Sequence, residues 1–273
     1  MVIESPRNAL VRQVGLLRTA RERRMRRAVL VDVPHLVEEG IAAGWRLRTV
    51  LSTAAFANSG KGAELLVRTE GMFIRSPEWP FPAETVVVSE RVLGSIGTTE
   101  APQGILAVFA LPPLAVRNET RYVLALDRLQ DPGNVGALLR AALALCGASV
   151  SVLAAAQGAD PYGPKALRAS AGASFHLRPA VVDNLMDEIR GSAHRVDWWS
   201  LMPTGGVPLA PGLATGRPVG LIVGNEGRGV SPQLLEVSRP LTIPLPGPVE
   251  SLNASIAGAL ALYVLCRQCM AIT

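Results

Sequence analysis

Three short segments rich in glycine and asparagine follow apolar stretches in the second half of the chain, and they restrict the fold more than any other feature. The segments are residues 131–140, 221–230 and 243–255, and each also carries charged residues. Each stands where an apolar strand is expected to give way to a helix, a junction that exposes backbone N–H groups. Ligands of α/β proteins bind at such junctions. The pattern therefore predicts an α/β enzyme that handles a nucleotide-like cofactor and an anionic partner.

Strands and helices alternate along the chain, which indicates two α/β domains. The expected strands are residues 28–32, 47–51, 86–88, 104–110, 122–126, 150–154, 219–223 and 241–243. The expected helices are residues 34–44, 62–68, 89–96, 165–169, 184–190, 254–266, the stretch after Asn134 and a helix that begins at Ser231-Pro232. We expect a smaller N-terminal domain over residues 1–111, a Pro-bearing and polar linker over 112–120, and a second domain over 121–273 with a largely parallel sheet.

The net charge of +5 and the pI near 9.6 favour a polyanionic partner, and the positive charge is almost all arginine. A composition bias of the source genome explains the arginine excess equally well. Within the first thirty residues, apolar positions recur at near-helical spacing, which predicts an amphipathic basic helix. Its arginines either contact RNA phosphates or form a solvated helix face. The candidate RNA-binding residues are Arg18, Arg21, Arg23, Arg24, Arg26 and Arg27.

Three cysteines, Cys146, Cys266 and Cys269, predict no disulfide framework and indicate a reducing compartment. Cys266-x-x-Cys269 lacks a second ligand pair, so we interpret both as packing residues and expect no metal site.

The first thirty residues have no apolar segment of the secretory type. The apolar helix at 254–266 is too short to span a bilayer. We therefore expect a cytoplasmic protein that does not enter the membrane.

The first segment places Asn134 where it could cap the following helix. That helix is expected to bury one face, made of Val135, Leu138, Leu139, Ala142 and Leu145, and to end at Gly147. Arg140 falls off the buried face. Taken singly, Asn134 could be only a cap and Arg140 only a solvated residue.

The second segment reads G-x-x-G-x-G from Gly224, which is neither a dinucleotide-binding loop nor a phosphate-binding P-loop. Glu226 in this loop could accept hydrogen bonds from a ribose or orient a catalytic group. In the third segment, Ser251 and Asn253 are polar candidates that could equally be helix caps. The apolar side chains of Ile243, Leu245 and Leu252 could line a slot for an adenine ring. None of the three histidines lies in these segments, which argues against His-based catalysis.

In this order and spacing, the three segments closely resemble the signature motifs of the SpoU/TrmH family, which are RNA ribose 2′-O-methyltransferases of the SPOUT class that use S-adenosyl-L-methionine (AdoMet). The resemblance implies a trefoil-knotted α/β catalytic domain, a ribosomal-protein-like N-terminal domain that binds the RNA, and a homodimer with active sites near its interface. Members with such an N-terminal domain often act on 23S ribosomal RNA, some of them conferring antibiotic resistance, and others modify transfer RNA.

By the same resemblance, Arg140 is the central catalytic residue, assisted by Asn134, Glu226, Ser251 and Asn253. AdoMet is expected to contact Gly224, Asn225, Ile243, Leu245, Gly247 and Leu252. Because arginine stays protonated in proteins, we expect Arg140 to stabilise charge rather than to act as a base. Three alternatives remain: a non-catalytic RNA-binding or ribosome-assembly protein, an enzyme acting on a small nucleotide, and a methyltransferase acting on a base nitrogen.

Overall fold

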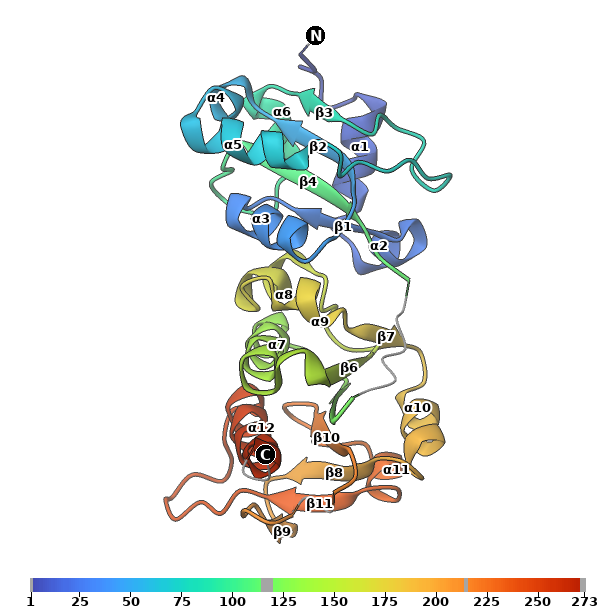
Figure 1. The fold of residues 1–273 in the computed structure, drawn as a ribbon, viewed down its shortest axis with the longest axis vertical. Helices are drawn as coiled ribbons and strands as arrows, with labels where there is room; N and C mark the ends of the chain where they lie inside the picture. The colour runs from blue at the N-terminus through green and yellow to red at the C-terminus, as the bar shows by residue number, and fades with distance from the viewer. Residues whose placement is uncertain (1, 114–119, 214–215, 271–273) are drawn as a thin grey trace. The chain divides into compact units, whose positions relative to one another are not determined.

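The computed structural model describes residues 2–113, 120–213 and 216–270, apart from the side chains of residues 148 and 267–270. The chain divides into two compact units at Pro113, and the short stretch Tyr162–Pro164 is grouped with the first unit (Figure 1). Residues 114–119 of the expected linker, and the side chain of Cys269, lie outside the described residues.

The first unit is built on a four-stranded sheet with the strand order β1-β4-β2-β3. Its strands are β1 (Ala28–Val31), β2 (Leu47–Ser52), β3 (Thr85–Val87) and β4 (Ile105–Ala110). Strand β4 runs antiparallel to β1 and β2, and β3 runs parallel to β2. Apolar runs bounded by turn residues predict all four strands to within one residue at either end.

Helices cover both faces of this sheet. They are α1 (Ala9–Leu16), α2 (Ala20–Arg26), α3 (Pro34–Ala42), α4 (Ala54–Ala57), α5 (Gly60–Thr69) and α6 (Glu90–Ile96). Helices α1 and α6 bury apolar side chains such as Val14 and Val92 against one face. On the other face, Gly40 of α3 lies so close to Phe109 that an added Cβ would stand 2.6 Å from the ring.

The single basic helix predicted for the first thirty residues is wrong, because the chain forms two helices there. Helix α1 ends at Leu16, and Thr19 begins α2 by accepting a hydrogen bond from the Glu22 N–H at 3.4 Å. Leu17, between the helices, is fully buried. A threonine cap competes with helix continuation, since its side chain satisfies a backbone donor of the new helix.

The second unit contains a seven-stranded sheet in the order β7-β6-β5-β10-β8-β11-β9. Its strands are β5 (Tyr122–Asp127), β6 (Val150–Ala155), β7 (Ala180–Val182), β8 (Asp197–Met202), β9 (Val207–Pro208), β10 (Val219–Gly224) and β11 (Arg239–Thr242). The neighbouring strands are parallel throughout, which confirms the predicted parallel sheet. The sequence did not indicate β7, β8 or β9.

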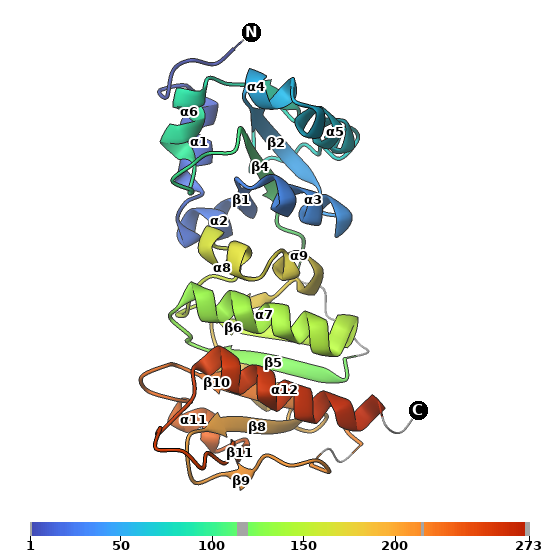
Figure 2. The same ribbon diagram turned by 90° about the vertical axis from the view of Figure 1, so that its left-hand side faces the viewer.

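Helices also flank both faces of the second sheet: α7 (Pro132–Cys146), α8 (Pro164–Ala169), α9 (Ala173–Leu177), α10 (Leu185–Ser192), α11 (Pro232–Leu235) and α12 (Ala254–Met270). Helices α7 and α12 lie side by side on one face (Figure 2). Their close approach requires Gly258, where an added Cβ would stand 2.8 Å from Leu138. Helices α10 and α11 pack on the opposite face. Within the described residues, no helix has the length and apolar character needed to cross a membrane.

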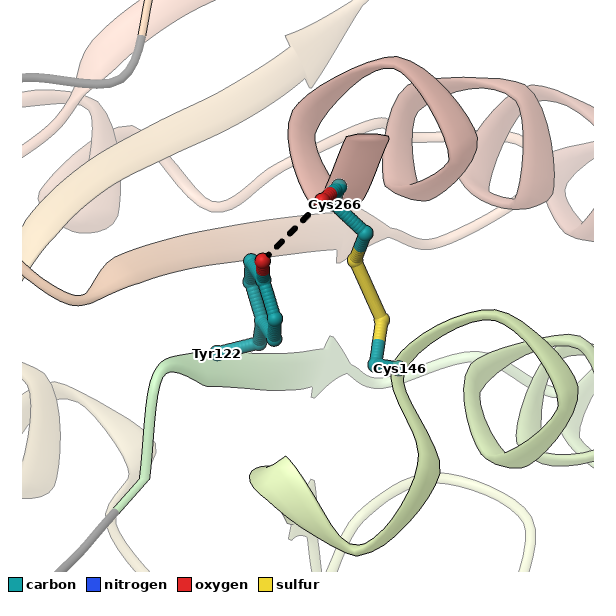
Figure 3. Close-up of a disulfide and its surroundings, with 3 residues drawn as sticks. All are labelled: Tyr122, Cys146 and Cys266. Atoms are coloured by element: carbon teal, nitrogen blue, oxygen red, sulfur yellow. Dashed lines mark hydrogen bonds between the residues drawn. A yellow bond between two sulfur atoms is a disulfide. The ribbon is translucent and has the colours of Figure 1, made fainter. Parts of the chain in front are cut away.

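The α7–α12 pair also carries a disulfide between Cys146 and Cys266 (Figure 3). The Tyr122 hydroxyl donates a hydrogen bond to the carbonyl oxygen of Cys266 at 3.2 Å. The prediction that the cysteines form no disulfide is therefore wrong. The two cysteines are 120 residues apart in sequence, and only the packing of α12 on α7 brings them together.

Candidate active site

The first of the three segments begins α7, and Asp131 caps this helix. Its side chain accepts a hydrogen bond from the Gly133 N–H at 2.8 Å, and Pro132 takes the first helical position. The prediction that Asn134 is the cap is wrong, because an aspartate followed by proline starts the helix three residues earlier. Asn134 therefore lies inside the first turn, where its side chain is only 8% exposed and points to partners other than its own helix.

Side chains from all three segments meet at Asn134. Its Nδ2 donates to Glu226 Oε1 at 3.0 Å, and its Oδ1 accepts from Asn253 Nδ2 at 2.9 Å. One residue comes from the β5–α7 junction, one from the loop after β10, and one from the start of α12. We call the three residues the Glu226–Asn134–Asn253 chain.

Asn253 caps α12 and also donates a hydrogen bond to Asn134. Its Oδ1 accepts hydrogen bonds from the N–H groups of Ser255 and Ile256 at 2.9 and 3.3 Å, which caps α12. Because the oxygen is used in capping, the Nδ2 group must face Asn134. The cap thus fixes the direction of the hydrogen bonds in the Glu226–Asn134–Asn253 chain: Asn253 donates to Asn134, and Asn134 donates to Glu226.

Glu226 is held by backbone groups as well as by Asn134. Its carboxylate accepts from the N–H groups of Gln130 at 3.0 Å and Asp131 at 3.1 Å. Burial raises the pKa of Glu226, but the hydrogen bonds from Asn134 and from these backbone groups outweigh that effect and leave the pKa below its usual range. The carboxylate is therefore ionised at neutral pH and accepts three well-placed donors.

The loop that carries Glu226 is compact. The backbones of Asn225 and Gly229 pair at 3.0 and 2.8 Å, and a Cβ on Gly224 would stand 2.3 Å from the Gly229 carbonyl carbon. The Asn225 side chain braces the turn, since its Oδ1 accepts from the N–H groups of Gly227 and Arg228 at 3.0 Å each. The glycines of this segment thus serve close backbone approach.

Arg140 and Ser251 stand outside these contacts. Both are exposed, and within the described residues neither makes a hydrogen bond to Asn134, Glu226 or Asn253. Arg140 follows Asn134 by six positions on α7, which places it about 120° away around the helix. The structure therefore joins three of the five predicted catalytic residues, Glu226, Asn134 and Asn253, through hydrogen bonds.

The segment from Ile243 to Leu252 fits a ring-bearing cofactor. The side chains of Ile243, Leu245 and Leu252 are half-buried, while the residues between Leu245 and Leu252 are exposed. An added Cβ on Gly247 would meet no atom within 4 Å, so its backbone is open to a ligand. Partly exposed apolar side chains and open backbone are compatible with the apolar lining and few polar contacts of an adenine site.

Sequence reasoning missed the supporting residues of the site. Asp127 and Ser231 join β5 to the end of the glycine loop, and Gln130 supplies a backbone donor to Glu226. Lys165 pairs with the cap Asp131 at 3.1 Å. The signal available was the position of Asp127, a carboxylate at the last residue of an otherwise apolar strand.

The N-terminal arginines divide into exposed and structural residues. Arg18, Arg21, Arg24 and Arg27 are exposed, and Arg26 pairs with Glu22 at 2.9 Å. Arg23 is 5% exposed and donates to the carbonyl oxygens of Leu17 and Arg18 at 2.8 and 2.9 Å. It thereby holds the turn between α1 and α2.

Comparisons with known proteins show the family of this chain. The model of the SpoU rRNA Methylase family matches residues 121–263, and the model of the MRM3-like substrate binding domain matches residues 8–107. A relative from Bacillus subtilis (strain 168), the 23S rRNA (guanosine(2553)-2'-O)-methyltransferase RlmP, is 33% identical over 268 residues, which cover 96% of this chain and 98% of the relative.

A second relative, from Streptomyces viridochromogenes, is a 23S rRNA (uridine(2479)-2'-O)-methyltransferase and is 30% identical over 285 residues, covering 96% of this chain and 91% of the relative. The crystal structure of the SpoU methyltransferase AviRb from the same organism, in complex with AdoMet, superposes with a TM-score of 0.77 at 27% identity, covering 97% of this chain and all of that chain. These matches span both units, and the chain belongs to the SpoU rRNA methylase family.

Proposed function

We propose that this protein methylates the 2′-hydroxyl of one ribose in 23S ribosomal RNA, with AdoMet as the methyl donor. The observation that carries the proposal is the Glu226–Asn134–Asn253 chain, which joins the three family segments through hydrogen bonds of 2.9 and 3.0 Å. The Bacillus and Streptomyces relatives, both named as 23S ribosomal RNA 2′-O-methyltransferases, support the choice of RNA.

In this proposal the protein's residues position the reactants, and the proton of the 2′-hydroxyl passes to solvent water as its oxygen takes up the methyl group. Glu226 is a weak base, because three donors hold its ionised form and lower its pKa. The amides of Asn134 and Asn253 do not titrate. Arg140 stays protonated and is suited to hold the adjacent phosphate and to stabilise negative charge on the ribose oxygen. Placing the oxygen in line with the methyl group supplies much of the acceleration.

AdoMet, when bound, supplies a methyl group on a sulfonium. The residues assigned to hold it are Gly224, Asn225, Ile243, Leu245, Gly247 and Leu252. The backbone at Gly224 and Gly247 would hold its polar atoms, and the three apolar side chains would line the site of its adenine.

The protein acts as a homodimer in this proposal. Three apolar residues of α12, Ile256, Leu260 and Tyr263, are exposed at i, i+4 and i+7 spacing, so they form one stripe of the helix surface. A stripe of this kind is suited to a second copy of the chain. Arg140 and Ser251, which lie outside the Glu226–Asn134–Asn253 chain, would complete the site across this interface.

RNA is bound by the exposed arginines of the N-terminal unit. Arg18, Arg21, Arg24 and Arg27 come from one short stretch of sequence, and arginine forks match phosphate oxygens. With ribosomal RNA as its substrate, the protein works in the cytoplasm.

Incubation with radiolabelled AdoMet and separate pools of ribosomal and transfer RNA tests the function. The expected result is label on one ribose 2′-oxygen of 23S RNA, located by digestion and mass spectrometry. Arg140→Ala should abolish transfer while AdoMet binding by calorimetry is retained. Label on transfer RNA, on a base, or only on free nucleosides would contradict the proposal. Absence of AdoMet binding would instead favour a non-catalytic RNA-binding protein.

A further inference from the structure

We propose that Asp127 is a positioning residue for methyl transfer, acting through Glu226. This inference rests on the proposed function and adds a residue to its machinery. Asp127 is the last residue of β5 and is only 3% exposed, although it carries a carboxylate. A buried carboxylate is costly unless its oxygens are hydrogen-bonded, so its partners indicate what it is for.

Both oxygens of Asp127 are used as acceptors. Oδ2 accepts from the backbone N–H of Ser231 at 2.7 Å and from its hydroxyl at 2.5 Å. Oδ1 accepts from Arg128 Nε at 3.0 Å. Arg128 Nη2 also donates to the Ser231 hydroxyl oxygen, which closes a compact group of three residues. Asp127 thus connects the end of β5 to the start of α11.

Arg128 has the left-handed backbone conformation, with φ of 57°. A non-glycine residue adopts this conformation at a cost, which its surroundings must offset. The ion pair with Asp127 offsets it, and the conformation directs the Arg128 carbonyl oxygen to two amides. That oxygen accepts from Asn225 Nδ2 at 2.9 Å and from Gln130 Nε2 at 3.1 Å.

The loop carrying Glu226 is therefore tied to the β5–α7 junction at both of its ends. Asn225 is bound at the beginning through the Arg128 carbonyl, and Ser231 is bound at the end through Asp127. The same junction presents the N–H groups of Gln130 and Asp131 to the Glu226 carboxylate. Asp127 therefore positions both partners of this contact. It binds Arg128, which precedes the two N–H donors, and it binds Ser231, which follows the loop that carries Glu226.

Asp127→Asn is the informative substitution because it keeps the size of the side chain. Asparagine has one acceptor oxygen and a donor NH2 group, so it must turn the NH2 group toward either Ser231 N–H or Arg128 Nε–H. One of the two connections is then replaced by an unfavourable approach of two donors. The Glu226 carboxylate should then shift relative to the Gln130 and Asp131 N–H groups, while the volume of the core is unchanged.

The experiment measures single-turnover methyl transfer to RNA at saturating AdoMet for wild type, Asp127→Asn, Glu226→Gln and the double variant. We expect Asp127→Asn to lower the transfer rate by about tenfold to a hundredfold, the size of effect produced by small misplacement of catalytic groups. RNA affinity should change by less than about twofold, because the substitution lies outside the arginine surface. The double variant should be about as slow as Glu226→Gln alone, since both changes disable one unit.

Val123→Ala is the matched control, because it lies on the same strand, is buried among apolar side chains and takes no part in the hydrogen bonds of Asp127. It should lower the unfolding temperature while the transfer rate stays within about twofold of wild type. If Asp127→Asn does not fold, Ser231→Ala removes only the hydroxyl and takes its place in the same cycle. Wild-type transfer by Asp127→Asn, or losses that multiply in the double variant, overturns the inference. A wild-type protein that transfers no methyl overturns the proposed function instead.

Discussion

Asn134 donates a hydrogen bond from Nδ2 to Glu226 Oε1 at 3.0 Å, across 92 residues of sequence. Because Asn253 occupies its other end, Asn134 has one possible orientation. The Asn134 amide therefore links Asn253, the cap of α12, to Glu226 in the loop after β10.

Asn253→Asp should separate the capping role of this residue from its role in the Glu226–Asn134–Asn253 chain. Aspartate keeps an oxygen for the N–H groups of Ser255 and Ile256 but has no donor for Asn134. We expect the transfer rate to fall about tenfold, which corresponds to about 1.4 kcal/mol, while stability is preserved. Asn253→Ala should lower the rate and also reduce stability by about 1 kcal/mol. Steady-state kinetics and urea unfolding check both, and a wild-type rate for Asn253→Asp would contradict the assigned role.

Stability should depend on pH through Glu226. The folded-state pKa is lowered, since hydrogen bonds from Asn134, Gln130 and Asp131 outweigh the opposing effect of burial. A lowered folded-state pKa stabilises the fold above the unfolded value, and this stabilisation is lost as the pH falls through the folded-state pKa. In urea unfolding, the stability difference between wild type and Glu226→Gln should therefore stay constant above about pH 5 and shrink as the pH falls below the unfolded-state pKa of about 4.3. A difference that also stays constant below that pKa would rule out the ionised, hydrogen-bonded carboxylate.

The Cys146–Cys266 disulfide should stabilise the second unit. Thiol titration of the denatured chain should find one reactive thiol among the three cysteines before reduction, and three afterwards. Cys146→Ser should cost up to about 4–5 kcal/mol, because the bond closes a long loop of the unfolded chain. Reduced wild type should unfold at the same urea concentration as the variant. Three reactive thiols in the untreated protein would show that the bond is not formed.

Ile256→Asp should dissociate the homodimer. This residue is 53% exposed, so a charge there leaves the fold of one copy intact and opposes the pairing of two apolar stripes. Light scattering after gel filtration should give a monomer with a mass near 28.8 kDa. Val67→Asp, at an apolar residue 62% exposed on α5, is the control and should remain dimeric. If the Ile256→Asp protein remains dimeric, the apolar stripe of α12 is not the dimer interface.

Arg21→Ala together with Arg24→Ala should weaken RNA binding and flatten its dependence on salt. For each phosphate that the protein no longer neutralises, the slope of log K against log salt falls by about 0.7 to 0.9. Arg68→Ala, which removes an exposed charge elsewhere in the same unit, should leave the slope unchanged. Arg23→Ala should instead lower stability by about 1–3 kcal/mol, because it removes the buried donors to Leu17 and Arg18. Fluorescence anisotropy over a salt series, beside urea unfolding, distinguishes these outcomes.

Local patterns in the sequence predicted most of the secondary structure. Short apolar runs bounded by polar residues, Gly or Pro located β5, β6 and β10 to within one residue, since a buried parallel strand needs a short apolar run. Strand β8, with the sequence Asp-Trp-Trp-Ser-Leu-Met, was missed although it lies between β10 and β11. Its two tryptophans pack on opposite faces of the sheet, and their strand preference stands in a short run flanked by Asp197 and Ser200 rather than by apolar residues.

The sequence by itself determined the two α/β domains, the three segments that build the site and, through their resemblance, the family. Only the tertiary structure decided which side chains meet there: Asn134 contacts Glu226 and Asn253, Asp127 holds Ser231, and Cys146 bonds Cys266. The physical reason is the range of the interactions. Strand and helix preferences act over a few neighbouring residues, whereas these contacts join residues far apart in the sequence that meet only after β5, β10 and α12 have packed.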